Sequence, residues 1–353
     1  MPSKILPRPL SQKNLNKKYQ ILALESKGRL DFTNERGKAN LELLQKYYSA
    51  FSNLYGALML KEAWELFSFA EKEITDKKQI LKKDFFAFSE VARYESYDYY
   101  VLEIDELYED EKRGNAGTRF IVNKKLYRKG YGRFSDYYRL AEEQMKRTLC
   151  ALEREEVLSW AEPGNLWRSS EGRALKRFIK SLTVHQNSDN IDTNGVKIAG
   201  KRLTEFVFWH KDEIINYDYT KRVWVKAELK EYYDVTELEK TLRAIEWRLN
   251  SSVLYADVKR QIQYLFDDLD EVGVRLTKSQ LKTLLKLYTN FSNNSRWWPL
   301  CGWKPVELYM QYKGNEGPTI SFGQGLQKAF ADGSIHKEEL VEEMKKLGFQ
   351  VIG

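Results

Sequence analysis

The chain of 353 residues has few of the side chains that build metal or redox sites: two cysteines, Cys150 and Cys301, and three histidines. No CxxC or HxxxH spacing occurs, so the sequence predicts no metal site. It also lacks the GxxxxGK[ST] phosphate loop and the GxSxG nucleophile elbow. We therefore predict no cofactor and assign no catalytic residue, which favours a protein that is not an enzyme.

Long apolar runs are also missing. No stretch of 18 apolar residues occurs, and the N-terminal segment MPSKILPRPLSQKNLNKKY has no apolar core of the kind found in signal peptides. The sequence therefore predicts a cytoplasmic protein with reduced thiols and no membrane partner.

Aromatic residues are abundant, with 22 Tyr, 17 Phe and 9 Trp. Large rings bury much apolar area, so most of them should lie in a core or an interface. Charge is segregated along the chain, although the net charge is only +7. Residues 1–40 and 112–147 are strongly basic, whereas residues 85–111 contain nine acidic side chains and one basic side chain, Arg93.

The basic region 112–147 supports two interpretations. Lysines and arginines interleaved with aromatic rings are typical of nucleic-acid binding, because cations neutralise phosphates and rings stack on bases. The neighbouring acidic block 85–111 can equally pair with this region within one fold, or the charges are solvated, and we favour these two interpretations over nucleic-acid binding. The candidate nucleic-acid-binding residues are Lys124, Lys125, Arg128, Lys129, Arg133, Tyr127 and Tyr131.

Apolar residues recur at helical spacing through most of the chain, which predicts a mainly α fold, a multi-helix assembly. The exception in the first half is the segment near 97–134, where YDYYVLEI and FIV favour a small β-hairpin element. In the second half, LTEFVFWHKDEIINYDYTKRVWVKAEL mixes β-branched and aromatic residues, so periodicity does not separate helix from strand there.

Composition divides the chain into four predicted parts. Residues 1–40 form a basic N-terminal extension, and residues 41–187 form a helical domain that contains the β and Gly-basic insertion near 97–134. The polar, Gly- and Asn-rich residues 188–201 are predicted as a linker or hairpin. Residues 202–353 are predicted as a second helical domain.

The segment SNNSRWWPLCGWKPVELY, residues 292–309, holds three tryptophans within seven residues. We interpret it as a rigid aromatic corner between two helices, with Trp297 and Trp303 buried. Pro299 favours an extended backbone at Trp298, which predicts a partly exposed Trp298 ring. The candidate partner-binding residues are Arg296, Trp298 and Trp303.

Three stretches carry a resemblance to a known family: LLQKYYSAFSNLYGALMLKEAWEL, KKDFFAFSEVARYESYDYYVLEIDELYED and LYTNFSNNSRWWPLCGWKPVEL. Together they resemble uncharacterised Firmicutes and phage proteins that often carry a C-terminal SEC-C zinc knuckle. That family usually has a Gly-His-Thr-Pro step where this chain reads Gly302-Trp303-Lys304-Pro305, and the cysteine-rich knuckle is absent here. The resemblance implies no established activity.

These features favour a non-enzymatic protein that binds a macromolecule, with a protein as the expected partner, through an aromatic and charged surface. Because the resemblance includes phage proteins, it suggests an inhibitor or regulator in host–phage conflict. The first alternative is nucleic-acid binding through the basic region. The second is a metal-dependent nuclease or hydrolase, which would need Asp257, Asp267 and Asp270 to converge.

Overall fold

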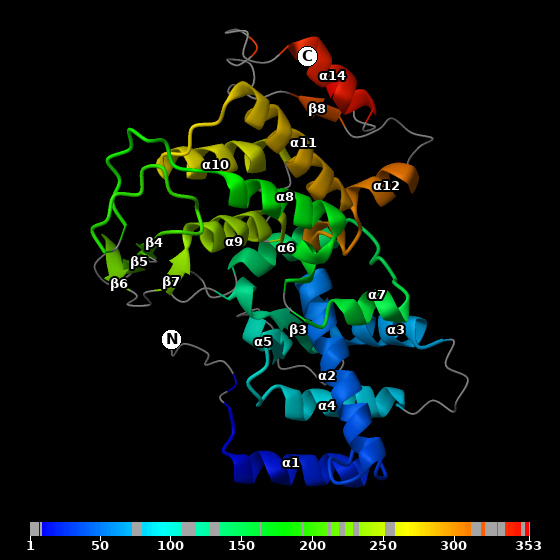
Figure 1. Ribbon diagram of the computed structural model, residues 1–353. Coiled ribbons are helices and arrows are strands. Elements are labelled where there is room, and N and C mark those ends of the chain that lie inside the picture. The colour runs from blue at the N-terminus through cyan, green and yellow to red at the C-terminus, as the bar shows by residue number, and fades with distance from the viewer. Residues whose placement is uncertain are drawn as a thin grey trace. The chain divides into compact units, whose positions relative to one another are not determined.

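The computed structural model divides the chain into two compact units, Met1–Asn165 and Leu166–Gly353 (Figure 1). The structure describes residues 7, 9–72, 80–107, 118–127, 135–162, 164–192, 194–210, 213–218, 223–228, 233–250, 258–311, 319–321, 330, 336–346 and 350–352.

The first unit is built around the long helix α2. Its N-terminus is capped by the Asn34 side chain, which accepts a hydrogen bond from the Gly37 amide at 2.7 Å. Its C-terminus is set by Gly56, whose φ of 72° suits a residue without a Cβ. The helices of this unit are α1 (Gln12–Glu25), α2 (Glu35–Tyr55), α3 (Leu60–Ala70), α4 (Lys82–Ala92), α5 (Ile104–Leu107), the 3₁₀ turn η2 (Lys124–Leu126), α6 (Ser135–Gln144) and α7 (Arg154–Ser159).

Aromatic rings fill the core of the first unit, as their abundance predicts. The Tyr48 ring of α2 lies 5.1 Å from both Phe85 and Phe88 of α4, measured between ring centroids. The buried Tyr48 hydroxyl donates a hydrogen bond to the Phe85 carbonyl at 2.7 Å. Each large ring contributes apolar area while its polar atom is satisfied, which fixes α4 against α2.

An antiparallel sheet in strand order β1-β3-β2 completes the first unit: β1 (Ala57–Met59), β2 (Tyr99–Leu102) and β3 (Phe120–Asn123). The predicted mainly α fold with a small β element in the first half is confirmed, and β2 and β3 are the two strands expected near 97–134. The element has three strands rather than the two of a hairpin. The extra strand β1 is only three residues long, so its pattern shows no period of its own.

The described part of the second unit contains helices and three two-stranded sheets. Side-chain caps start two of its helices: Thr236 and Glu239 exchange hydrogen bonds as a capping box, and so do Thr277 and Gln280. Its helices are η3 (Asn165–Arg168, which starts at the boundary), α8 (Ser170–Ser181), α9 (Glu237–Asn250), α10 (Val258–Glu271), α11 (Lys278–Asn294), η5 (Trp298–Leu300), α12 (Pro305–Gln311) and α14 (Lys337–Lys346).

The ambiguous segment in the second half folds as strands. The pairs β4–β7 and β5–β6 are antiparallel, and β8–β9 is parallel. The strands are β4 (Val207–His210), β5 (Glu213–Asp218), β6 (Val223–Glu228), β7 (Tyr233–Thr236), β8 (Thr319–Ser321) and β9 (Gln350–Ile352). The second half is therefore helical with added β pairs, because β-branched and aromatic residues suit paired strands.

The segment predicted as a linker or hairpin, 188–201, lies inside the second unit. An antiparallel bridge joins Ile191 to Lys197, and the Ile198 side chain is buried. The Asn190 side chain donates a hydrogen bond to the Val272 carbonyl at the end of α10, at 3.2 Å. The contacts thus divide the chain near residue 165, whereas its composition suggested 188–201.

None of the helices in the part of the chain that the structure describes is long and apolar enough to cross a membrane.

Candidate functional site

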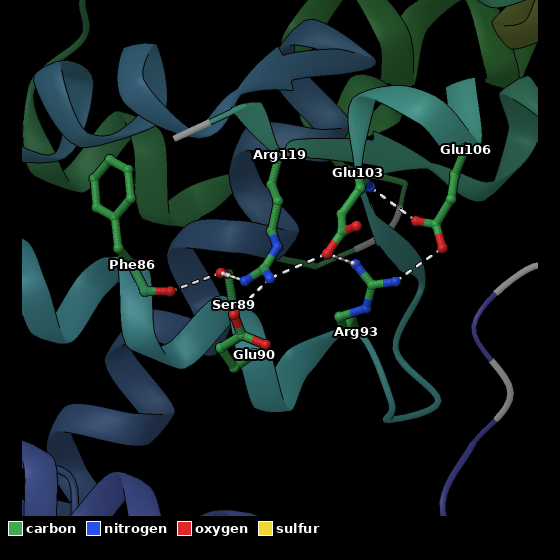
Figure 2. Close-up of polar contacts among 7 residues, drawn as sticks. All are labelled: Phe86, Ser89, Glu90, Arg93, Glu103, Glu106 and Arg119. Atoms are coloured by element: carbon green, nitrogen blue, oxygen red, sulfur yellow. Dashed lines mark hydrogen bonds and ion pairs between the residues drawn. The ribbon is translucent and has the colours of Figure 1, made fainter. Parts of the chain in front are cut away.

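A buried network of arginines and carboxylates lies between α4 and the sheet of the first unit (Figure 2). The Glu103 carboxylate, directly after β2, contacts both arginines at 3.2 Å: Nη1 of Arg93 and Nη2 of Arg119. Nη2 of Arg93 also reaches Glu106 on α5 at 2.8 Å. One carboxylate therefore bridges two guanidinium groups, one from the residue that follows α4 and one from the residue before β3.

Two further residues of α4 complete the network. Nη2 of Arg119 lies 2.5 Å from the Glu90 carboxylate, and its Nη1 donates to the Ser89 hydroxyl at 3.0 Å. The Ser89 hydroxyl in turn donates to the Phe86 carbonyl at 2.6 Å, as Figure 2 shows. Arg119 thus ties the sheet to two successive residues of α4.

This network decides part of the electrostatic question raised by the sequence. Arg119 belongs to the basic region 112–147, and Glu90 and Glu103 belong to the acidic block 85–111. Arg93, Arg119 and Glu103 are all buried. Burying an isolated charge is costly. Buried charged groups are therefore found next to opposite charges and hydrogen-bond partners. For Arg119, the acidic and basic blocks therefore pair within the fold.

The sequence carried a signal for this network that we did not use. Ser89 of α4 and Arg93, the C-cap residue of that helix, are four positions apart, so they lie on the same side. They interrupt the apolar positions Phe85, Phe88 and Val91, all of which are buried. Polar residues on the buried side of a helix indicate a buried partner of opposite charge.

The candidate nucleic-acid-binding residues fall partly within the described residues. Nζ of Lys124 lies 5.3 Å from the centroid of the Tyr100 ring, and the Tyr127 ring meets Tyr100 edge-on at 6.0 Å. Lys125 is exposed, while Lys124 and Tyr127 are half-buried. The structure therefore brings Lys124 and Tyr127 together around Tyr100. The other four candidates, Arg128, Lys129, Tyr131 and Arg133, lie outside the described residues.

The tryptophan segment of the second unit corrects our prediction for Trp298. Trp297 is buried as expected, but Trp298 is only 1% exposed and Trp303 is half-buried. Trp297 Nε1 donates to the Ser292 carbonyl of α11 at 2.9 Å, while η5, which begins at Trp298, packs against α9. Adjacent tryptophans can both be buried because protein lies on more than one side of this segment.

Arg296 is buried too, with 3% of its surface exposed. Its guanidinium makes a two-pronged contact with the Glu307 carboxylate of α12, at 3.0 Å and 3.1 Å, and Nη1 donates to the Gly302 carbonyl at 2.8 Å. Arg296 therefore joins the loop between η5 and α12 to the start of α12 through buried contacts. Neither Arg296 nor Trp298 lies on the surface where we placed a partner.

The carboxylates of the predicted hydrolase site point to local partners. Exposed Asp267 accepts a hydrogen bond from Gln263 at 2.8 Å, and exposed Asp270 pairs with Arg275. Asp257 lies outside the described residues. Among the residues that the structure describes, no three His, Cys, Asp or Glu side chains are grouped so that they could hold a metal ion.

Glu237, in the first turn of α9, is a buried carboxylate with incomplete partners. It is 1% exposed, and within the described residues neither of its oxygens accepts a hydrogen bond, although Nζ of Lys240 lies 3.3 Å away. Burial raises the pKa of Glu237, the lysine opposes this shift, and the charges of Asp268 and Glu271 add to it.

We predict that Glu237→Gln makes folding less sensitive to pH. Because the folded-state pKa is raised, the folded chain holds this proton to higher pH than the unfolded chain. The free energy of unfolding therefore falls as pH rises from the usual glutamate range through the raised pKa. Urea unfolding at pH 5 and pH 7 should show a smaller pH difference in Glu237→Gln and a gain of about 1 kcal/mol at pH 7. Exposed Glu338→Gln is the control. An unchanged pH difference in Glu237→Gln would contradict the prediction.

Comparison of the chain with protein-family models, with curated proteins and with solved structures gives no match. The resemblance to knuckle-bearing phage and Firmicutes proteins therefore stays a prediction.

Proposed function

We propose that this is a non-enzymatic binding protein that contacts another protein through an aromatic and charged surface of its first unit. The observation that carries the proposal is a recurring surface pair, in which a lysine ammonium lies over an aromatic ring that is itself at least partly exposed. In the described part of the chain four such pairs occur: Lys18 over Tyr94, Lys72 over Phe69, Lys82 over Phe86 and Lys124 over Tyr100, at 4.5, 4.1, 5.9 and 5.3 Å from the ring centroids.

These pairs suit binding because each one places apolar area beside a positive charge. Partly exposed rings offer contact area at low conformational cost, and cations around them steer an acidic partner and select against basic ones. A cation over a ring also holds the side chain in one geometry before binding. The aromatic content and segregated charge of the sequence support a protein partner, and each of the four pairs is a candidate point of contact for it.

The test is capture of a partner by the full chain from a lysate of the native host at physiological salt, after nuclease treatment. We expect one stoichiometric protein. The variant Lys72→Ala/Lys82→Ala/Lys124→Ala should reduce its capture about tenfold, since it removes three positive charges that an acidic partner would contact. The control carries the same change at three exposed lysines outside the pairs, Lys38, Lys61 and Lys83. Equal capture by the triple variant and the control would overturn the proposed surface.

Nucleic-acid binding is the second candidate, and one observation favours it. Lys124 and Tyr127, from the basic region 112–147, form a cluster with Tyr100. Single-stranded nucleic acids bind to such combinations of cations and aromatic rings. The capture experiment separates the two functions, because a nucleic-acid bridge is lost on nuclease treatment and a protein contact persists. A role in host–phage conflict and a cytoplasmic location stay predictions.

A further inference from the structure

Within the described residues, helix α1 contacts the rest of the first unit through one side. Its Tyr19 hydroxyl donates to the Glu95 carboxylate at 2.9 Å, and the Leu22 side chain is buried. Nζ of Lys18 lies over Tyr94, and the Leu10 amide, just before the helix, donates to the Tyr94 carbonyl at 3.2 Å. These contacts fix α1 on α4 and thereby decide which side chains point away from the unit.

The opposite side of α1 exposes apolar side chains. With about 100° of rotation per residue, Lys13, Lys17, Gln20, Ile21 and Leu24 share one side of the helix, and all five are exposed. We call these five residues the outer face of α1. Ile21 is 54% exposed and Leu24 is 80% exposed. The other exposed side chains of α1 are polar, so Ile21 and Leu24 form an apolar pair one turn apart on this face.

The charge of the outer face narrows the choice of partner. Lys13 and Lys17 are its charged residues, and the acidic residue of α1, the exposed Glu25, lies at the end of the helix, one turn after Ile21. A second copy docked face to face would bring Lys13 and Lys17 of both chains into one contact, against one Glu25 from each chain, so the contact would carry excess positive charge. The aromatic residue of the helix, Tyr19, faces Glu95, so the outer face offers no ring on which a base could stack. The apolar part spans only one turn, whereas helices that lie in a membrane surface carry a broad apolar face.

We infer that the outer face of α1 docks on another protein that offers an apolar depression with an acidic rim, which Leu24 and Ile21 fill while Lys13 and Lys17 pair with the rim. This mode is the insertion of an amphipathic helix into a groove. The inference rests on the proposed function and adds to it the surface element and the chemistry of the partner. Lys18, the neighbour of Lys17 in the sequence, forms one of the four lysine–ring pairs, with Tyr94.

The first experiment locates the contact. The full chain carries a photo-crosslinking amino acid at Leu24 or, as a matched control, at Met145, which is also 80% exposed. After irradiation in lysate of the native host, we expect one protein to crosslink from position 24 and not from position 145. Mass spectrometry should place the crosslink in a segment with acidic and apolar residues. Crosslinking to a second copy of this chain would overturn the inference.

The second experiment measures affinity for that protein after it has been purified. Ile21→Ser and Leu24→Ser should each weaken binding about tenfold or more, because each removes a buried apolar anchor. Lys17→Glu should weaken binding strongly at about 50 mM salt and less at about 500 mM salt. Met145→Ser and Lys38→Glu are the matched controls and should leave affinity unchanged. Thermal melts of all five variants should agree with the wild type, since the altered side chains are exposed.

The outcomes separate the inference from the proposed function. If the full chain captures a partner whose affinity is the same for the wild type and for Ile21→Ser, Leu24→Ser and Lys17→Glu, the outer face is not the docking surface, although the proposed function stands. If no protein is captured, both fail. Vesicles with about 30% phosphatidylserine and a single-stranded oligonucleotide serve as further probes. Binding to either one that is lost in Leu24→Ser would assign the outer face to a different class of partner and overturn the inference.

Discussion

Replacing Trp298 with alanine is expected to lower the free energy of unfolding by about 3–5 kcal/mol, the usual cost of truncating a buried tryptophan. Trp298 is 1% exposed in a segment that is fixed by its neighbours: the Cys301 amide donates to its carbonyl at 2.9 Å, and Gly302 donates to the Trp297 carbonyl at 3.1 Å. Such a loop has little freedom to close over the cavity. The melting temperature should fall by roughly 6–20 °C, measured by circular dichroism or calorimetry.

Two companion variants make this prediction specific. Trp298→Phe keeps a ring in the site and should cost clearly less than Trp298→Ala. Trp303→Ala removes a half-buried ring and should also cost less. If Trp298→Ala melted like the wild type, Trp298 would be exposed in solution, as the proline that follows it suggested, and the buried position would be wrong.

Removing Arg119 is expected to cost about 3–5 kcal/mol, because Arg119→Ala leaves the carboxylates of Glu90 and Glu103 in or beside the buried network with Arg93 as the remaining cation. The hydroxyl of Ser89 also loses its donor. The unfolding midpoint in urea should fall accordingly. Glu103→Gln in the same background should recover part of the loss, since it removes the carboxylate that bridges the two arginines.

The matched control for Arg119 is Lys146, which belongs to the same basic region of the sequence. Lys146 pairs with Glu143 on the surface, with 61% of its side chain exposed. Exposed ion pairs contribute about 0–1 kcal/mol, so Lys146→Ala should change stability little. Equal effects of Arg119→Ala and Lys146→Ala would show that the network around Arg119 is hydrated and contributes no more than a surface pair.

Local sequence determined much of the secondary structure. Gly56 ends α2 with a positive φ, Gly273 follows α10 with a φ of 93°, and Thr277 caps α11, all as their residue types predict. The strands β2 and β3 were visible from their β-branched and aromatic residues. These features depend on backbone preferences and on hydrogen bonds between residues three or four positions apart, which a linear pattern contains.

The positions of individual side chains depended on contacts between distant parts of the chain. The sequence shows that Arg119 and Glu103 belong to blocks of opposite charge. It does not show that they meet in the buried network beside α4, whereas Lys146 is exposed. It shows Trp298 beside a proline, but not that η5 packs against α9. It marks α1 as basic with scattered leucines, but not that Leu22 turns inward while Leu24 remains exposed.

The sequence by itself thus determined the mainly α class, the small β element of the first half and the places where many helices begin and end. Only the tertiary structure decided which arginines are buried, which tryptophans are covered and which face of α1 is available to a partner. The physical reason is that capping and periodicity act within one turn of the chain. Burial, by contrast, is a property of every element that packs around a residue, including elements far away in the sequence.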